Sequence, residues 1–137
     1  MKRLAVVAIA LLLILGQAEP THEARALQPV MTVDKLYLGQ YHISAYCACE
    51  KCCGKSDGIT SSGAVATEGI TVACNSLPQG TVIEIEGIGE RIVQDKLAQR
   101  IDDRYDGMII DLYISDHQTA LNFGVKKLDV YEVKEAE

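Results

Sequence analysis

The sequence predicts a small, mostly β domain, a six-stranded barrel with one short helix. Short stretches rich in Ile, Val and Tyr alternate with polar residues, and glycines recur between these stretches. Several short strands with glycine-containing turns are typical of closed all-β folds. The chain of 137 residues has no Trp and a single Phe, so we expect a core of Ile, Val, Leu and Tyr.

Six segments have the composition of β-strands. The first is the longest, and the last shows a clear alternation of apolar and polar residues. The third and fourth are separated by Gly87-Ile88-Gly89, a connection typical of a β-hairpin. The predicted strands are residues 35–47, 69–74, 81–87, 90–95, 108–114 and 128–133.

One short helix is predicted between the last two strands, over residues 116–124. Ser115 or Asp116 can cap its first turn, and Gly124 is a typical helix-ending residue. Its apolar face is expected to consist of Ala120, Leu121 and Phe123.

Residues 1–18 predict a secretory signal peptide. Two basic residues precede an uncharged apolar run, residues 4–16, and small residues follow it. The run is shorter than the roughly 20 residues that a membrane-spanning helix needs. We therefore expect a secreted protein with no membrane attachment after cleavage; the alternative is an uncleaved anchor.

Residues 19–34 hold two of the three prolines and show little periodicity, which predicts a flexible tether. The folded domain is expected to cover residues 35–137. Loss of residues 1–18 changes the 13 basic and 19 acidic residues to 11 and 19, which gives a net charge of −8. Such a surface repels phosphate backbones, and no basic stripe opposes it, so nucleic acid is not an expected partner.

The five cysteines allow three interpretations: disulfides, a structural zinc site or reduced thiols. Four of them lie within residues 47–53, and the fifth is Cys74. Outside the cell, closely spaced cysteines more often form disulfides, although neighbours such as Cys52 and Cys53 rarely bridge each other. A zinc site would use the Cys-x-Cys-x-x-Cys motif with Cys74. The disulfide interpretation is favoured, so no metal and no cofactor is expected.

Two acidic residues interrupt apolar strand patterns. Asp95 ends the segment 90–95, and Asp111 has apolar residues on both sides. An ionised carboxylate is costly to bury without partners. One interpretation places Asp111 on the outer, polar face of its strand. The other places it in a partly apolar cleft, where burial raises its pKa and lets it donate a proton.

Seven motifs follow one another in a fixed order between residues 40 and 133. They are "SAY" (44–46), "DGITSSG" (57–63), "TVAC-N" (71–75), "LPQGT" (77–81), "IVQD" (92–95), "IIDLYISDH" (109–117) and "ALNFG" through "LDVYEV" (120–133). In this order the sequence resembles the three-aspartate, or 3D, domain family of secreted bacterial cell-wall proteins, which is related to the catalytic domain of lytic transglycosylases. The resemblance implies a double-psi β-barrel with a peptidoglycan glycan strand lying across an acidic groove.

By position, the second and third family aspartates correspond to Asp95 and Asp111, and the first corresponds to Asn75. The resemblance implies that Asp111 is the catalytic acid and base of a lytic transglycosylase. Such an enzyme cleaves the bond between MurNAc and GlcNAc, and the sugar's own C6 hydroxyl closes a 1,6-anhydro ring. Asp95 is expected to support the site and to help raise the pKa of Asp111 if the two are close.

Four further residues are candidates for glycan binding: Thr60, Ser61, Gly63 and Asn75. The first three belong to a loop whose hydroxyls either bind sugar or only form a turn. The segment 96–108 departs from the family pattern, and its residues 102–107, "DDRYDG", either supply replacement acids or form a solvated turn. His117 and His42 are given structural roles.

Two rival functions remain open. The first is a module of the same fold that binds glycan without cleaving it, which the uncharged Asn75 favours. The second is a metal- or redox-responsive surface protein that uses the cysteines.

Overall fold

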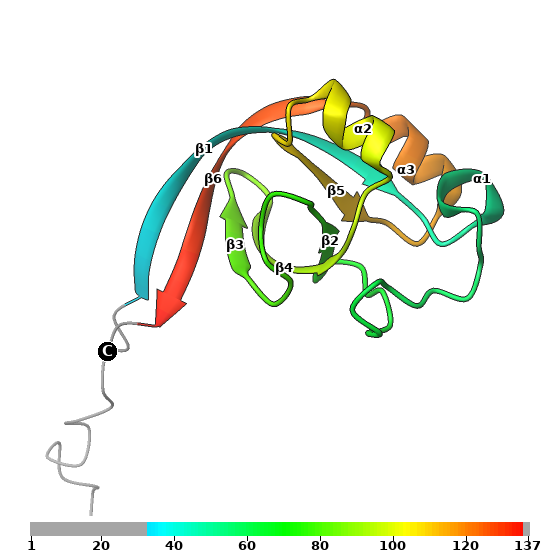
Figure 1. Cartoon of the computed structure of the whole chain (residues 1–137), viewed down its shortest axis with the longest axis horizontal. Coiled ribbons are helices and arrows are strands. Elements are labelled where there is room, and N and C mark those ends of the chain that lie inside the picture. Colours follow the sequence, from blue (N-terminus) through cyan, green and yellow to red (C-terminus); the bar gives the residue numbers. More distant parts are fainter. Residues whose placement is uncertain (1–32, 136–137) are drawn as a thin grey trace, which may run out of the picture. The chain divides into compact units, whose positions relative to one another are not determined.

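The computed structural model describes residues 33–135, where six strands close into a barrel in the order β1-β5-β2-β4-β3-β6 (Figure 1). The signal peptide and nearly all of the tether lie outside the described residues. The strands are β1 (Val33–Tyr46), β2 (Thr71–Ala73), β3 (Val82–Ile85), β4 (Gly89–Asp95), β5 (Ile109–Tyr113) and β6 (Lys126–Glu135). The helices are α1 (Glu50–Cys53), α2 (Gln99–Arg104) and α3 (His117–Phe123).

The prediction of a mostly β, six-stranded barrel is confirmed, with small shifts of the strand ends. β1 starts at Val33, so the last two residues of the predicted tether belong to the barrel. The connection between β3 and β4 is the expected hairpin, in which the N–H of Ile88 donates to the carbonyl of Ile85 at 3.0 Å.

The prediction of a single helix is wrong, because three short helices occur within residues 33–135. α3 was predicted correctly: the carboxylate of Asp116 accepts the N–H of Thr119 at 2.8 Å, and Gly124 ends the helix. Its Leu121, however, is 58% exposed and does not belong to the buried face. None of the three helices is long and apolar enough to cross a membrane.

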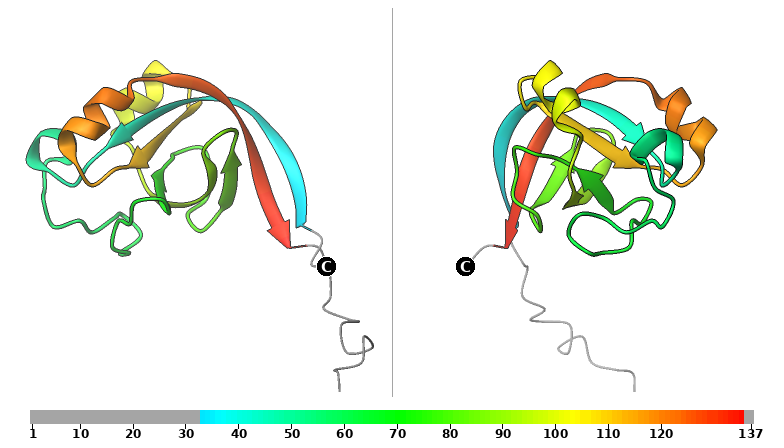
Figure 2. Two further views of the ribbon diagram at one scale, coloured as in Figure 1. Left: turned by 180° about the vertical axis from the view of Figure 1, so that it is seen from behind. Right: turned by 45° about the vertical axis from the view of Figure 1, so that its right-hand side comes forward.

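Strand pairing combines two parallel pairs, β1–β5 and β2–β4, with four antiparallel ones. The long strands β1 and β6 form a curved ribbon that arches over the shorter strands (Figures 1 and 2). A register shift occurs in this ribbon at Gly39, whose φ of 119° is a conformation that glycine adopts easily. Residues 33–41 of β1 pair with β6 alone, and residues 42–46, which follow the bulge, pair with β5.

The main core fills the barrel with the aliphatic side chains that the composition predicts. Burying each such side chain contributes about 1.5–3 kcal/mol. The buried members are Tyr41, Ile43, Val72, Cys74, Ile83, Ile85, Val93, Ile110, Leu112 and Val130.

A second, smaller core lies on the outside of the barrel. Its buried members are Ala73, Leu97 and Ile109, and α2 packs on them through Ile101 and Tyr105. Because residues along a strand alternate between the two faces, the strands that fill the barrel also supply this outer surface. α2 therefore covers part of the outer face of β5 and β2, and the candidate site lies beneath it.

Candidate active site

Four residues form a row across neighbouring strands on this outer face. Ser44 of β1 pairs with Asp111 of β5, Asp111 pairs with Ala73 of β2, and Ala73 pairs with Asp95 of β4. Paired residues point to the same side of a sheet. The two aspartates are separated by two strand spacings, about 10 Å between their Cα atoms. Ala73, a small residue that also borders the cleft, lies between them.

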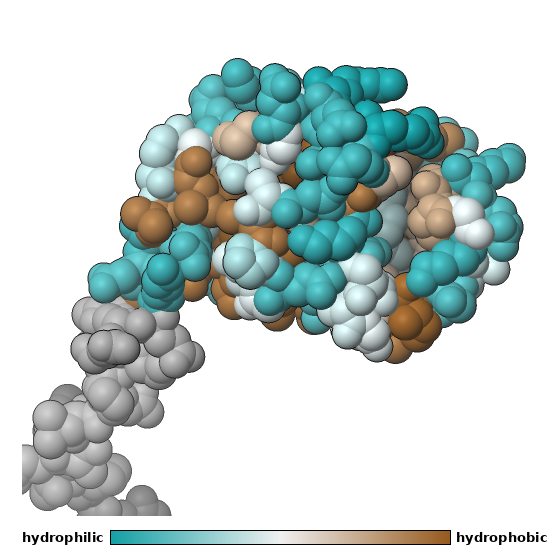
Figure 3. Space-filling view, viewed as in Figure 1, coloured by the Kyte–Doolittle hydropathy of each residue, from teal (hydrophilic) through white to brown (hydrophobic). Residues whose placement is uncertain are grey.

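This row forms the floor of a cleft with a volume of about 560 Å³. Tyr46, Cys52 and Cys53 contribute one wall. The other consists of Lys96, Leu97, Ala98, Arg100, Ile101, Arg104 and Tyr105. In the view of Figure 3, a hollow lies between the hydrophilic side chains of the segment leading to α2 and the tan and white side chains near α1. The cleft thus contains both aspartates that the sequence identified.

The position of Asp111 agrees in part with each of its two sequence interpretations. Its neighbours Ile110 and Leu112 point into the barrel, so Asp111 points away from the main core. That outer face is covered by α2, however, and the side chain lies half-buried in the cleft.

Burial is the main influence on the pKa of Asp111 and raises it above the usual value, because the ionised form loses hydration. The hydroxyl of Ser44 donates to Oδ1 of Asp111, and this hydrogen bond partly opposes the rise in pKa. The charge of Asp95, which we expected to contribute, is not a cause of the shift. Asp111 is therefore a carboxyl group with one hydrogen-bond partner and a pKa above its usual value.

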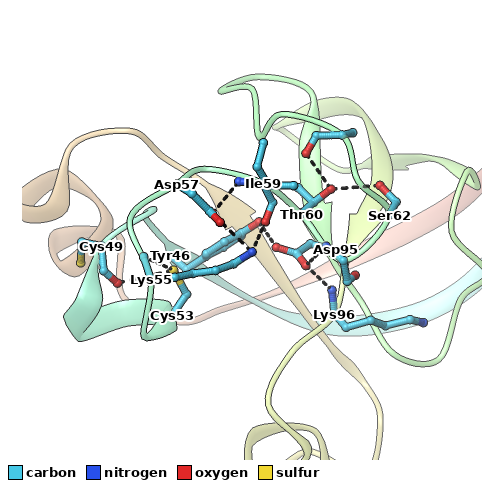
Figure 4. A network of polar contacts seen from close by, with 12 residues as sticks. Tyr46, Cys49, Cys53, Lys55, Asp57, Ile59, Thr60, Ser62, Asp95 and Lys96 are labelled. Carbon is cyan, nitrogen blue, oxygen red and sulfur yellow. Dashed lines mark hydrogen bonds and ion pairs between the residues drawn. The ribbon is translucent and has the colours of Figure 1, made fainter.

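Asp95 has a different environment, because three donors converge on it (Figure 4). Its Oδ1 accepts the backbone N–H groups of Ser61 and Lys96, each at 2.9 Å. Its Oδ2 accepts the hydroxyl of Tyr46, also at 2.9 Å. These bonds fasten the loop of residues 57–66 and the end of β1 to the end of β4.

Tyr46 lies close to both acids. Burial, together with the charge and the hydrogen bond of Asp95, raises the pKa of Tyr46 far above its usual range, and the charge of Asp111 adds to the effect. The phenol is therefore a permanent donor. Its ring also contacts Tyr113 edge-on, with ring centroids 5.6 Å apart, which holds Tyr46 at the cleft wall.

Three basic residues line the opposite wall although the whole chain is acidic: Lys96, Arg100 and Arg104. Nζ of Lys96 donates to the carbonyl of Cys74 at 3.3 Å. Within residues 33–135, no ion pair joins either arginine to an acid. Sequence reasoning missed this group, yet its regular spacing of four residues, which places such side chains on one side of a helix, is a signal that could have found it.

The four residues predicted to bind glycan do not line the cleft. Thr60 is 4% exposed, and its hydroxyl donates to the carbonyl of Ala64 at 3.0 Å. Gly63, with φ of 85°, completes the turn by donating its N–H to the carbonyl of Thr60 at 2.9 Å. Ser61 is exposed, and its hydroxyl accepts a hydrogen bond from Gln79 at 2.6 Å. In this loop the turn interpretation describes the observed contacts.

Asn75 forms a paired contact with the backbone of Leu97. Its Oδ1 accepts the N–H of Leu97 at 3.0 Å, and its Nδ2 donates to the carbonyl of Leu97 at 3.2 Å. A carboxylate cannot donate, so this contact requires the amide. Asn75 thereby holds the start of the 96–108 segment.

The acids of "DDRYDG" are not replacement groups for the cleft, because none of Asp102, Asp103 and Asp106 lines it. The interpretation as a solvated turn is also only partly correct. Asp102 and Asp103 belong to α2, and the turn begins after Arg104. Asp106, with φ of 52°, lies in that turn.

The five cysteines all lie within the described residues and are free thiols, so the favoured disulfide interpretation does not describe this structure. Sγ of Cys47 and Sγ of Cys49 are 3.2 Å apart, whereas a disulfide requires about 2.05 Å. Cys74, the fourth ligand of the zinc interpretation, is buried in the main core near Ser76. His117, which we regarded as structural, lies beside the cysteines instead.

Comparison with known protein families, curated proteins and solved structures finds no match to this chain. Functional interpretation therefore depends on the motif order and on the geometry of the cleft.

Proposed function

We propose that this protein is a secreted peptidoglycan lytic transglycosylase of the three-aspartate type, with Asp111 as its catalytic residue. The observation that carries the proposal is a carboxyl group with a raised pKa on the floor of an open cleft. The two parallel pairs, β1–β5 and β2–β4, support assignment of the barrel to the double-psi class as part of the same proposal.

The proposed reaction needs one carboxyl group that acts twice. Protonated Asp111 donates its proton to the glycosidic oxygen as the bond from C1 of MurNAc to that oxygen breaks. The resulting carboxylate accepts the proton of the C6 hydroxyl, whose oxygen bonds to C1 and closes the 1,6-anhydro ring. Asp111 is then protonated again, and no water is consumed.

The second acid of the cleft supports this scheme over hydrolysis. A glycoside hydrolase needs a second carboxylate that is free to act as nucleophile or to activate water. Asp95 accepts three hydrogen bonds from the protein, so its oxygens are already engaged. Asp95 is therefore a positioning residue in this proposal, and it acts through Tyr46 and the backbone of Ser61.

The basic wall supports an anionic, peptide-bearing glycan as the substrate. Arg100 and Arg104 face the cleft and have no ion pair with an acid of residues 33–135. Glycan strands of peptidoglycan carry the carboxylates of their peptide stems, and guanidinium groups bind carboxylates well. Polyphosphate backbones remain disfavoured by the net charge of −6 of the whole chain.

The test is digestion of purified sacculi, with detection of 1,6-anhydromuropeptides by mass spectrometry. We expect the wild-type protein to form these products. Asp111→Asn should lower their rate of formation by about 10²- to 10⁴-fold, the usual contribution of a positioned acid or base. Asp103→Asn makes the same change at an exposed residue of α2 that does not line the cleft, and this variant should keep full activity.

The rival function is a module that binds glycan without cleaving it. Co-sedimentation of the wild-type protein with sacculi, without anhydro products, would overturn the enzymatic proposal and support the binding module. Hydrolysed products with a free reducing end would overturn the transglycosylase mechanism while leaving a muralytic role.

A further inference from the structure

Four side chains with metal-binding atoms converge beside the cleft: Cys47, Cys49, Cys52 and His117. Their three Sγ atoms and the Nδ1 of His117 all lie within 4.8 Å of one another. The cysteines come from the end of β1 and from α1, and His117 is the first residue of α3. Two segments that are far apart in the sequence thus meet at one point.

The distances between these atoms are close to the edges of a coordination tetrahedron and slightly shorter than them. Sγ of Cys47 lies 3.2 Å from Sγ of Cys49 and 3.5 Å from Sγ of Cys52. Nδ1 of His117 lies 3.3, 3.4 and 3.5 Å from the sulfurs of Cys47, Cys49 and Cys52, respectively. A tetrahedral zinc ion with sulfur at about 2.3 Å and nitrogen at about 2.0–2.1 Å has edges of roughly 3.5–3.8 Å.

Local backbone structure holds these ligands in place. Cys49 is the N-cap of α1, and its sulfur accepts the N–H of Cys52 at 3.4 Å. This bond fixes the position of the Cys49 sulfur relative to the first turn of α1. On the other side, the capping bond from Asp116 to the N–H of Thr119 fixes the first turn of α3, which carries His117.

We propose that Cys47, Cys49, Cys52 and His117 bind one Zn²⁺ ion in a closed, structural site. On binding, the three thiols release their protons and the sulfurs and the Nδ1 atom coordinate the ion. Four protein ligands complete a tetrahedron, so no position is left for substrate. These ligands differ from those of the zinc site considered in the sequence analysis, because His117 takes the place of Cys74.

The site would stabilise one wall of the cleft. Cys52 and Cys53 line the cleft, and Cys47 follows Tyr46, the residue that donates to Asp95. Zinc would join this wall to α3 and so hold Tyr46 in position. The inference does not depend on the proposed enzymatic activity, since metal content is measured without any substrate.

The test measures metal bound to the full-length protein after purification under reducing conditions, by inductively coupled plasma mass spectrometry. We expect about one zinc per chain. Cys49→Ser and His117→Ala should each weaken zinc binding by about a hundredfold or more, because each removes a direct ligand rather than a residue around one. Cys53→Ser and Cys74→Ser are matched controls outside the tetrahedron and should keep one zinc.

A second measurement does not depend on whether the variants fold. Wild-type protein loaded with Co²⁺ should show the intense visible bands of tetrahedral cobalt and a thiolate charge-transfer band. Intact mass should show five reduced thiols once the metal is removed. A protein without metal whose mass shows two disulfides, or equal loss of zinc in Cys53→Ser and Cys49→Ser, would overturn the proposal.

Discussion

Asp111 and Asp95 occupy the same row of the same sheet, yet the surroundings of their carboxyl groups differ. Asp95 receives three hydrogen bonds, two of them from backbone N–H groups. Asp111 receives one, from Ser44, and burial raises its pKa. Asp95 therefore joins three parts of the chain through its hydrogen bonds, whereas Asp111 is a buried carboxyl group with few partners and a raised pKa.

Strand register alone therefore does not assign a role to Asp95 or to Asp111. Both aspartates line the cleft, and their spacing in the sequence is equally consistent with a catalytic pair. Their hydrogen-bond partners separate them, and those partners come from other segments: the 57–66 loop for Asp95 and β1 for Asp111. Three predictions test whether this separation is real.

The largest effect is expected from Asp95→Ala. This substitution leaves the N–H groups of Ser61 and Lys96 and the hydroxyl of Tyr46 without their acceptor. Hydrogen bonds to charged groups contribute about 1.5–3 kcal/mol each and are not additive, so we expect a loss of about 2–3 kcal/mol in the free energy of unfolding. Urea denaturation measures it.

The control for this prediction is Asp103→Ala, which removes an exposed acid of α2. Its effect should stay within about 0.5 kcal/mol. If Asp95→Ala were as stable as the control, the hydrogen bonds of Asp95 would not stabilise the fold. A direct catalytic role for Asp95 would then become the better interpretation.

A smaller effect, of opposite sign, is expected from Asp111→Asn. Because the pKa of Asp111 is raised in the folded state, the folded protein binds more protons than the unfolded chain between the unfolded and folded pKa values. Wild-type stability therefore falls as pH rises through this window. Asparagine does not titrate, so the variant should gain stability relative to wild type from about pH 4 upward.

The measurement is the free energy of unfolding of both proteins at several pH values. The difference should level off above the folded pKa of Asp111, at about 1.4 kcal/mol for each unit by which that pKa is raised. A difference that changes in the other direction would mean that the fold stabilises Asp111 as a carboxylate.

Sequence reasoning predicted the barrel and both acids but not the surroundings of the acids. Apolar alternation revealed the strands because the core residues of β5, such as Ile110 and Leu112, recur at every second position. The same pattern singled out Asp111, because this acidic residue interrupts an apolar strand. α1, with four residues, is too short for a helical period to appear, and only the spacing of Lys96, Arg100 and Arg104 hinted at α2.

The contacts that decide function depend on tertiary structure. Ser44 meets Asp111 only because β1 and β5 pair in parallel, 67 residues apart in the sequence. His117 meets Cys47 across 70 residues, so no local cysteine pattern reveals it. Strand order does not follow from strand composition, and these partners could not be predicted without it.

The smallest and most specific effect is expected from Ser44→Ala. The Ser44 hydroxyl stabilises the carboxylate of Asp111, so its removal should raise the pKa of Asp111 further. Because the proposed reaction begins with the protonated acid, the alkaline limb of the profile of kcat/KM against pH should move to higher pH. Carbon NMR titration of the Asp111 carboxyl measures the same shift without substrate, and Ser56→Ala, at an exposed position, should leave both unchanged. A limb that moves to lower pH would show that Ser44 stabilises the protonated form, so that its hydrogen bond raises the pKa of Asp111 in the same direction as burial.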